Sequence, residues 1–375
     1  MIVLSAACNY RAPNNNNPDD PDAATTDSDT STDTPVIPPD TQNKPWWDDN
    51  WTRRRPITVD TTQLTGTSEQ FPVLVRLSPA TLDYGAVKAN GEDLRFITLD
   101  HTTELPFEID RFGDNANTEV WVRLPSLAMG VATAFWVYHG NPDAQPTGSG
   151  AATFAGNVSV HHMGSTFADS TGNGHDGTGL GGAGLTPIEG VVGRARDFDG
   201  TDDRVQLAGE SAFDFTTALS VSAWVRREAF DVEYQAIVNK GDSAWRIQRE
   251  NETNNLGFGW SDAEGPFQNL QGNVNINTNT WRHVAITFDG AVKRTYVDGV
   301  LDRDVNNSNA ILTNNQPVMF GRNEEATTGG FREWNGDIDE VRITGAVRDA
   351  AWMKAEFVTV TSSTFVTVGD EEQLP

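Results

Sequence analysis

The chain has 375 residues, and its 27 Lys and Arg against 53 Asp and Glu give a formal net charge of −26. At roughly 150 residues per domain, this length predicts two domains, each large enough to bury a core. The negative charge excludes nucleic acid as a partner, because a polyanion would be repelled. It is typical of a soluble protein outside the cell, with either a solvated acidic surface or carboxylates that hold cations.

The N-terminal residues contain the only cysteine, Cys8, so an internal disulfide is excluded. No apolar run of about 18 residues is present, which excludes an ordinary transmembrane helix. The stretch MIVLSAAC, residues 1–8, resembles the lipobox of bacterial lipoproteins, and we interpret it as the remnant of a lipoprotein signal with Cys8 as the lipidated residue. Seven residues precede Cys8 and none is Lys or Arg, so the alternatives are a start further upstream or a chance match.

Residues 9–45 consist mainly of Asn, Asp, Thr, Ser and Pro. A segment with so little apolar surface cannot offset the entropy that it loses on ordering, so we expect a disordered linker. Behind a lipidated cysteine, this linker would be a tether that lifts the folded domains off a membrane. A lipid anchor at Cys8 is the only membrane contact that we predict.

A first folded region is expected over residues 46–147. Short strand-like runs follow one another at 71–77, 92–100, 104–112, 119–125 and 133–140. In EVWVRLP, Val120, Val122 and Leu124 share one face, and this period of two is typical of half-buried strands. Gly, Pro, Asn and Asp fill the connections. The pattern predicts an all-β sandwich.

A second β region follows over residues 150–370. LSVSAWVR at 219–226 alternates, and WRHVAITFDGAVKRTYVDGV at 281–300 indicates strands separated by two Asp-Gly turns. Many short strands with such turns predict a sandwich or jelly roll. Only residues 349–357, DAAWMKAEF, have a helical pattern. The fold class is therefore all-β, with two β-sandwich domains after the disordered tether.

Five motifs of the second region occur in the order expected of a laminin-G-like jelly roll, which has a concanavalin-A-like lectin fold. They are ARDFDGTDDRVQL, LSVSAWVR, WRHVAITFDG, TYVDG and WNGDIDEVRI. The first region, from WWDDNW through FPVLVRL, GEDLRF, LPFEID and VWVRLP to FWVYHGN, resembles the domain-of-unknown-function family 2341. That family often precedes laminin-G-like domains in secreted bacterial proteins, but it implies no activity. The resemblance implies a secreted protein or a lipoprotein of the bacterial cell surface or outer membrane.

Glycosidases also use concanavalin-A-like folds, and one such family carries its working carboxylates on an E-I-D-x-x-E strand. The nearest stretch here is GDIDEVRI, in which alternation places Asp337 and Asp339 on one face and Glu340 on the other. A retaining glycosidase needs two carboxyl groups about 5–5.5 Å apart, one of them an acid. No such acid can be identified, and H-E-x-x-H, G-x-S-x-G and P-loop motifs are missing from the sequence. We therefore predict that the protein is not an enzyme.

Three of the six histidines lie between residues 158 and 177: His161, His162 and His175. Alternation places His162 with Val160 toward the core, and His161 with Met163 outward. Adjacent histidines on a strand diverge, so they cannot chelate one ion together. We expect packing for the pair and solvent exposure for His175, and no zinc site.

The stretch FADSTGNGHDG matches the D-x-x-G-N-x-x-x-G turn of the laminin-G-like family, which the resemblance places near the final strand. Hard oxygen ligands suit calcium, so we predict one structural calcium ion. The predicted ligands are Asp169, Asn173 and Asp339, with Asp176 and Asp203 as substitutes. The alternative is that Asp169 caps its own turn and Asp339 pairs with Arg342 or Arg194.

Five tryptophans of the lectin-like region offer flat rings for stacking on sugars: Trp224, Trp245, Trp260, Trp281 and Trp334. Large aromatic residues of a sandwich usually belong to its core, so we expect at most one or two to be exposed. We predict non-catalytic recognition of a glycan or of a cell-envelope protein. The alternatives are a structural spacer without its own ligand and, third, a glycoside hydrolase.

Overall fold

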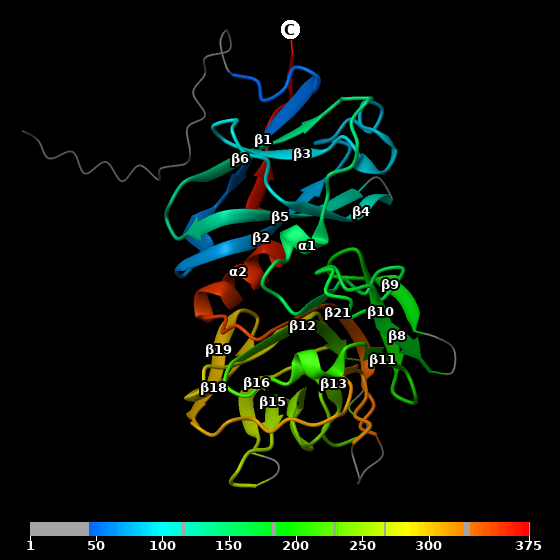
Figure 1. Ribbon diagram of the computed structural model, residues 1–375, viewed down its shortest axis with the longest axis vertical. Helices are drawn as coiled ribbons and strands as arrows, with labels where there is room; N and C mark the ends of the chain where they lie inside the picture. Colours follow the sequence, from blue (N-terminus) through cyan, green and yellow to red (C-terminus); the bar gives the residue numbers. More distant parts are fainter. Residues whose placement is uncertain are drawn as a thin grey trace, which may run out of the picture. The chain divides into compact units, whose positions relative to one another are not determined.

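The computed structural model describes residues 45–114, 117–181, 185–227, 230, 232–265, 268–325 and 331–374. Most of the regular secondary structure within them is β-strand, as predicted, and the two α-helices are α1 (Gly150–Thr153) and α2 (Ala350–Thr361) (Figure 1). No helix among these residues is long and apolar enough to span a membrane. Cys8 and residues 9–44 lie outside the described residues, so the lipobox and the tether stay predictions.

The first domain is a sandwich of two sheets. One sheet has the strand order β22-β1-β6-β3, with β23 also paired to β1, and the other has the order β2-β5-β4. The bounds are β1 Arg53–Val59, β2 Thr67–Leu77, β3 Arg95–Thr98, β4 Phe107–Asp114, β5 Asn117–Ala128, β6 Thr133–His139, β22 Val366–Val368 and β23 Glu372–Gln373. The alternation expected in β5 is confirmed, because Val120, Val122 and Leu124 join the core of this sandwich.

The C-terminal end of the chain belongs to the first sandwich, which corrects the predicted range of 150–370 for the jelly roll. The helix expected at 349–357 is confirmed as α2, and its Trp352 ring lies 4.9 Å from the ring of Phe71 in β2. β22 and β23 then pair antiparallel with β1 (Figure 1). Apolar residues three apart on α2, such as Trp352 and Ala355, form the face that packs into this core.

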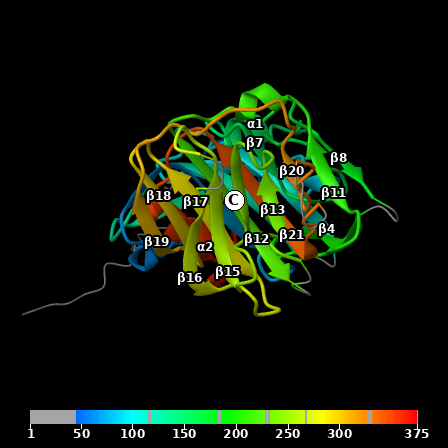
Figure 2. The same cartoon turned by 90° about the horizontal axis from the view of Figure 1, so that it is seen from below.

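The second domain is a jelly roll of two larger sheets (Figure 2). One has the order β19-β18-β17-β12-β21-β10-β9, with β7 paired to β21, and the other has the order β16-β15-β14-β13-β20-β11-β8. The bounds of the first are β7 Ser159–His161, β9 Thr186–Glu189, β10 Arg194–Asp199, β12 Leu219–Arg227, β17 Arg282–Phe288, β18 Val292–Val297, β19 Val300–Asn306 and β21 Asn335–Thr344. Those of the second are β8 Gly177–Leu180, β11 Arg204–Leu207, β13 Ala236–Asn239, β14 Trp245–Arg249, β15 Asn255–Trp260, β16 Leu270–Asn275 and β20 Met319–Phe320.

One of the two predicted Asp-Gly turns connects two strands of the jelly roll as a tight hairpin. Asp298 and Gly299, which connect β18 to β19, have φ values of 52° and 73°. Positive φ at both positions is what a tight hairpin of this kind requires, and Gly and Asp adopt it at low cost. The apolar faces of both sheets meet in one core that includes the buried rings of Trp245, Trp260 and Trp334.

The two sandwiches share a smaller buried cluster. It contains Leu74 and Trp121 from the first sandwich and Val160, Val192 and Trp224 from the jelly roll. The strands β7, β12 and β21 of the eight-stranded sheet are therefore buried on both faces over most of their length. This burial on both faces decides where several of the candidate site residues lie.

Candidate functional site

The structure does not bring the predicted calcium ligands together. The carboxylate of Asp169 accepts hydrogen bonds from the backbone N–H groups of Val160 (3.2 Å), Thr171 (3.0 Å) and His175 (3.2 Å). Asp169 therefore caps its own turn, which is the alternative that the sequence left open. Asn173 uses its amide to donate to the carbonyl oxygen of Val158 at 3.0 Å.

Asp339 lies elsewhere and has other partners. Its Oδ2 accepts the backbone N–H groups of Val191 (2.8 Å) and Val192 (3.2 Å) in the turn between β9 and β10. None of the contacts among the described residues joins Asp339 to Asp169, and the expected pairing of Asp339 with an arginine is replaced by these backbone bonds. Burial and the charge of Glu340 raise the pKa of Asp339 well above its ordinary value.

The two substitute ligands, Asp176 and Asp203, also have different partners. Asp176 accepts the backbone N–H of Asp169 at 2.8 Å. Asp203 lies beside Asp199 and Asp202, and in the described part of the chain these three form the one group of metal-ligating side chains with oxygens within 4.8 Å of one another. An Asp-rich turn also forms without an ion, since Asp199 accepts the backbone N–H of Thr201 at 2.8 Å. The calcium ion stays a prediction.

The histidines lie on the opposite faces from those expected. His161 is fully buried on the side of the jelly-roll core, with its ring 5.3 Å from Phe320, and Met163 belongs to the same core. His162 faces the first sandwich, where its ring stacks on Trp121 at 6.3 Å. Alternation correctly predicted that the two rings lie on opposite faces of the sheet. Because both faces are buried, hydrophobicity did not show which face belongs to the jelly-roll core. His175 is half-buried against Phe213.

His162 lies at one end of a buried chain of charges. Its Nδ1 is 2.6 Å from Oε1 of Glu340, and its Nε2 is 3.4 Å from Oε2 of Glu108 in β4. Oε2 of Glu340 in turn accepts a hydrogen bond from Arg342 at 3.0 Å. Although burial lowers the pKa of His162, these two carboxylates outweigh it and hold the pKa well above its ordinary value.

The carboxylates considered for catalysis are enclosed. Glu340 has φ 47° at a register shift between β12 and β21, so it faces the same side as Asp339, which corrects the alternation expected from the sequence. Asp339 is 0% and Glu340 2% exposed, and Asp337 pairs with Arg226 at 2.5 Å. These groups therefore form no cleft open to a polysaccharide.

Four of the five tryptophans of the lectin-like region are buried, as expected for aromatic residues of a sandwich. Trp245, Trp260 and Trp334 are buried between the sheets, and Trp224 is buried toward the first sandwich. Trp281 alone among the five is half-buried, with the guanidinium of Arg226 5.2 Å from its ring. A platform of exposed indoles is therefore not how this jelly roll would hold a sugar.

One cleft of the jelly roll lies at its rim, where β12 and β14 end. This rim cleft has a volume of about 370 Å³ and is lined by Arg227, Phe230, Val232, Glu233, Arg249, Glu252, Asn254 and Asn277. Clefts that bind small ligands begin at about 300 Å³. None of these residues was singled out from the sequence, because they come from three separate connections.

An aromatic ring stands at the centre of the rim cleft, with polar groups around it. The guanidinium groups of Arg227 and Arg249 lie 4.6 Å and 4.7 Å from the ring centre of Phe230. Arg227 donates to Oδ1 of Asn277, whose amide donates to Asn254 at 3.2 Å. Arg249 is fixed by donating to the carbonyl oxygen of Thr253 at 2.7 Å. The cleft thus presents hydrogen-bonding groups beside an aromatic ring.

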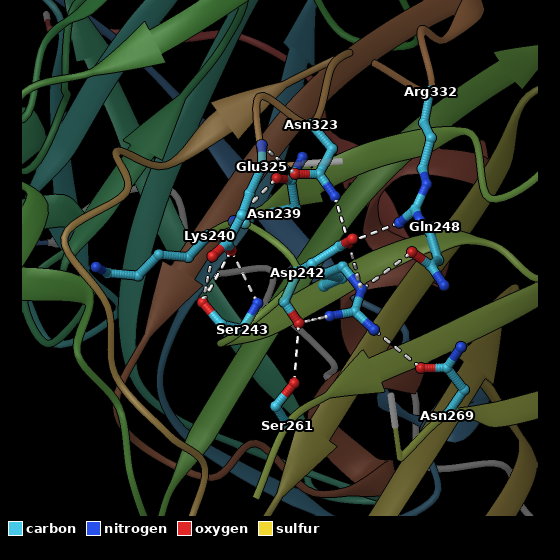
Figure 3. Close-up of polar contacts among 12 residues, drawn as sticks. Asn239, Lys240, Asp242, Ser243, Gln248, Ser261, Asn269, Asn323, Glu325 and Arg332 are labelled. Carbon is cyan, nitrogen blue, oxygen red and sulfur yellow. Dashed lines mark hydrogen bonds and ion pairs between the residues drawn. The ribbon is translucent and has the colours of Figure 1, made fainter. Parts of the chain in front are cut away.

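The outer side chains of β14 form a fixed polar layer (Figure 3). Arg246 donates to Gln248 at 3.3 Å and to Asn269 at 3.0 Å, and burial lowers the pKa of its guanidinium to about 10. In β15, a Cβ at Gly257 would lie 2.4 Å from Glu250, and one at Gly259 would lie 2.5 Å from Arg246. The G-x-G pattern of NLGFGW is the sequence signal that makes room for this layer.

The turn between β13 and β14 is held by ionic contacts. Asp242 accepts hydrogen bonds from Arg332 at 2.6 Å and from Asn323 at 2.7 Å (Figure 3). The fully buried ammonium of Lys240 lies 2.9 Å from Asp214 and 3.2 Å from Glu210. It also donates to the carbonyl oxygens of residues 314 and 316 at 2.8 Å and 3.2 Å. Lys240 thus occupies a cage of oxygen atoms of the kind that a metal cation would otherwise fill.

The comparisons with known families agree with this geometry. Residues 199–369 match the family model described as the concanavalin A-like lectin/glucanases superfamily. The jelly roll is similar to that superfamily. Residues 90–172 match domain of unknown function 2341, and the order of the two matches confirms the resemblance predicted from the sequence. No curated protein matches the chain.

Several solved structures match part of the chain at low identity and with TM-scores below 0.5. The binding domain of Paraclostridial Mosquitocidal Protein 1 has a TM-score of 0.46 and 18% identity over 56% of this chain and 53% of its own. Domain 4 of AbnA, a GH43 extracellular arabinanase from Geobacillus stearothermophilus solved with arabinotriose, has a TM-score of 0.45 and 22% identity over 53% and 96%. The botulinum neurotoxin serotype G binding domain has a TM-score of 0.43 and 17% identity over 54% and 51%. The chain spans about half the length of the two toxin binding domains that it matches.

Proposed function

We propose that the protein recognises glycans without catalysis and that the rim cleft of the jelly roll is the site. The observation that carries this proposal is the combination of amide, guanidinium and carboxylate groups around Phe230 in one cleft of about 370 Å³. Sugars offer hydroxyl groups to such polar side chains and a C–H face to an aromatic ring. A match to a superfamily that includes lectins is consistent with this role.

The absence of catalysis belongs to the same proposal. The carboxylates of β21 are buried beneath the first sandwich, and the two carboxylates of the rim cleft, Glu233 and Glu252, are both exposed. Exposure to water denies both groups the apolar surroundings in which a glycosidase places its proton donor. Glycan binding without turnover is the expected result with any bound polysaccharide.

The proposal is tested by applying the full chain to a glycan array and by measuring the affinity of each bound glycan. Asn254→Ala removes an exposed amide of the cleft, and we expect it to weaken binding at least about tenfold, or roughly 1.4 kcal/mol. Arg303→Ala, at an exposed position of β19, is the matched control and should bind as the unaltered chain does. Equal binding by both variants, or no bound glycan on the array, would favour a protein ligand or a spacer instead.

We further propose that this recognition takes place at a bacterial surface, with Cys8 as the lipid-anchored residue and residues 9–45 as the tether. The sequence alone supports this placement. Metabolic labelling with a palmitate analogue, with the gene expressed from its natural start, should label the protein but not Cys8→Ser. A single acyl chain anchors only marginally, so stable attachment requires several chains. Equal label on both proteins would contradict the anchor.

A further inference from the structure

The contact between the two sandwiches combines apolar side chains with buried ionisable groups. Its apolar part is small beside the core of either sandwich and consists of Leu74, Trp121, Phe154, Val160, Val192, Trp224 and Val360. Two domains of one chain are expected to move relative to each other unless the interface between them is large and apolar. The charge state of the ionisable groups therefore bears on whether this contact stays closed.

His162, which follows β7 of the jelly roll, connects the two sandwiches. Its Nδ1 lies 2.6 Å from Oε1 of Glu340 in β21, and its Nε2 lies 3.4 Å from Oε2 of Glu108 in β4 of the first sandwich. Both ring nitrogens are donors only when the imidazole is protonated. A neutral His162 would lose its hydrogen bond to one of these two carboxylates.

Asp110 in β4 reaches the jelly roll at the turn between β9 and β10. Its Oδ2 lies against Gly193, where a Cβ would overlap it, and this oxygen is buried without a hydrogen-bond partner among the described residues. A neutral carboxyl group occupies such a place at a much lower cost than a carboxylate, which would be desolvated without a donor. The closed contact therefore favours the protonated form of Asp110.

Charged groups of both sandwiches face His162 and Asp110. Those of the first sandwich are Glu108 and Glu119, the latter paired with Arg76 and Arg111, and those of the jelly roll and α2 are Asp339, Glu340, Arg342 and Glu356. The arginines keep their charge at every pH considered. Each proton that leaves His162 or Asp110 thus adds a negative charge where carboxylates of the two sandwiches already meet.

We propose that the contact between the sandwiches is proton-gated: it is closed while His162 and Asp110 hold their protons and opens when both have lost them. This device involves no residue of the rim cleft and does not depend on glycan recognition there. It would change the position of the jelly roll relative to the first sandwich, and hence relative to the N-terminal segment, in response to the pH of the surroundings.

The direction of the response follows from proton binding. Burial raises the pKa of Asp110 from 3.8 to about 7 in the closed contact. Burial opposes the protonation of His162, but the charges of Glu340 and Glu108 outweigh it and raise the pKa of His162 well above 6.5. Because the closed contact binds both protons more tightly than the open one, a rise in pH shifts the equilibrium toward the open arrangement.

The test measures the distance between the sandwiches in the full chain by electron resonance between two spin labels. Thr102→Cys in the first sandwich and Asp304→Cys in β19 provide exposed positions for the labels, in a Cys8→Ser background. We expect one distance at about pH 5, and a second, longer distance whose share relative to the first rises at least about tenfold by about pH 9. A single unchanged distance over this range would overturn the proposal. So would loss of the β-sheet circular dichroism in the same range, because the chain would then be unfolding.

Two variants separate the roles of the two groups. Asp110→Asn cannot ionise, so it should stay closed at a pH where the unaltered chain has begun to open. His162→Gln carries no charge and should show the longer distance already at about pH 5. His175→Gln, a matched change at a half-buried histidine beside Phe213, should behave as the unaltered chain does. Opening of all three variants at the pH of the unaltered chain would overturn the gate.

A second measurement keeps the proposal testable if His162→Gln does not fold. NMR titration of the histidine rings in the unaltered chain gives the pH at which His162 loses its proton. This loss should fall within the range in which the longer distance appears. A ring that is already neutral at about pH 5, or that keeps its proton after the contact has opened, would overturn the role of His162.

Discussion

Arg54 at the start of the first sandwich and Glu372 near its end are joined by an ion pair that closes the domain. Nε and Nη2 of Arg54 donate to the same oxygen, Oε2 of Glu372, at 2.9 Å and 2.7 Å. The guanidinium lies between two indoles, 4.3 Å from the ring of Trp46 and 4.2 Å from that of Trp136. One side chain thus links the first strand, the segment before it and the last strand of the described chain.

We therefore expect Arg54→Ala to destabilise the protein strongly. The Arg54 side chain is 1% exposed and that of Glu372 is 30% exposed, so the change removes hydrogen bonds to a half-buried charge, which are worth about 1.5–3 kcal/mol, together with the packing of the guanidinium. Urea unfolding of the full chain measures this loss. Arg53→Ala is the control, because the Arg53 side chain is 27% exposed and such a pair contributes about 1 kcal/mol or less. Equal losses in the two variants would contradict the closing role of Arg54.

The same relationship predicts that residues 150–375 do not fold as an independent jelly roll. In this fragment, the apolar face of α2 and the strands β22 and β23 have lost their partners in β2 and β1. We expect the fragment to aggregate or to unfold without a single cooperative transition, as calorimetry would show. A sharp transition equal to that of the full chain would show that the C-terminal segment does not need the first sandwich.

Asp110, near the contact between the sandwiches, predicts a contribution to stability that is lost as the pH rises from about 4 to 7. Burial raises the pKa of Asp110 from 3.8 to about 7, and its Oδ2 has no hydrogen-bond partner among the described residues. The folded state therefore binds more protons than the unfolded state in this window, so stability is lost as Asp110 ionises. Since one pKa unit corresponds to about 1.4 kcal/mol, we expect a loss of about 2–4 kcal/mol.

Other ionisable groups also contribute to how stability depends on pH. His162, whose folded pKa is raised, adds a further loss above its ordinary pKa of 6.5. Glu356, despite its burial, has a pKa lowered to about 2 by His283 and Arg342, and its contribution is lost as the pH falls below 4.5. His161 opposes Asp110, because burial lowers the pKa of His161 from 6.5 to about 4 and its contribution to stability is lost as the pH falls from about 6.5 to 4. Asp110→Asn should remove the loss due to Asp110, so that the free energy of unfolding rises more steeply with pH between 4 and 7 than in the unaltered chain, and Asp143→Asn at an exposed position should not change this slope.

The contacts of Asp169 predict a stability loss that does not depend on calcium. Asp169→Ala removes the acceptor for three backbone N–H groups, and each unsatisfied group costs about 1–3 kcal/mol where it stays buried. We expect the same decrease of the thermal midpoint in excess calcium and in chelator. A decrease found only in calcium would place the ion at Asp169 after all.

The cage around Lys240 predicts that removing the ammonium creates a need for another cation. Lys240→Ala leaves Glu210 and Asp214 facing each other with the carbonyl oxygens of residues 314 and 316, and we expect a loss of about 3–5 kcal/mol. Calcium at about 100 times its dissociation constant should return about 2.7 kcal/mol. Thermal unfolding in calcium, in magnesium and in chelator checks this. Lys354→Ala on α2 is the control.

The sequence determined the local features of this protein. Alternation in EVWVRLP, the Asp-Gly turns of 281–300 and the ordered motifs from ARDFDG to WNGDIDEVRI were sufficient for two β-sandwiches, the second of them a jelly roll. These signals depend on residues close in the chain, whose side-chain period and turn geometry are set by the backbone itself. The sequence also offered the capping of its own turn by Asp169 as an alternative, because a turn likewise depends on residues close in the chain.

Tertiary structure decided everything that depends on which face meets which partner. His161 and His162 exchanged sides because both faces of their sheet are buried, and Glu340 joined Asp339 because a bulge interrupted the alternation. Residues from distant segments meet where β22 pairs with β1, in the oxygen cage of Lys240 and in the rim cleft. Such contacts arise from long-range packing, which no periodicity along the chain encodes.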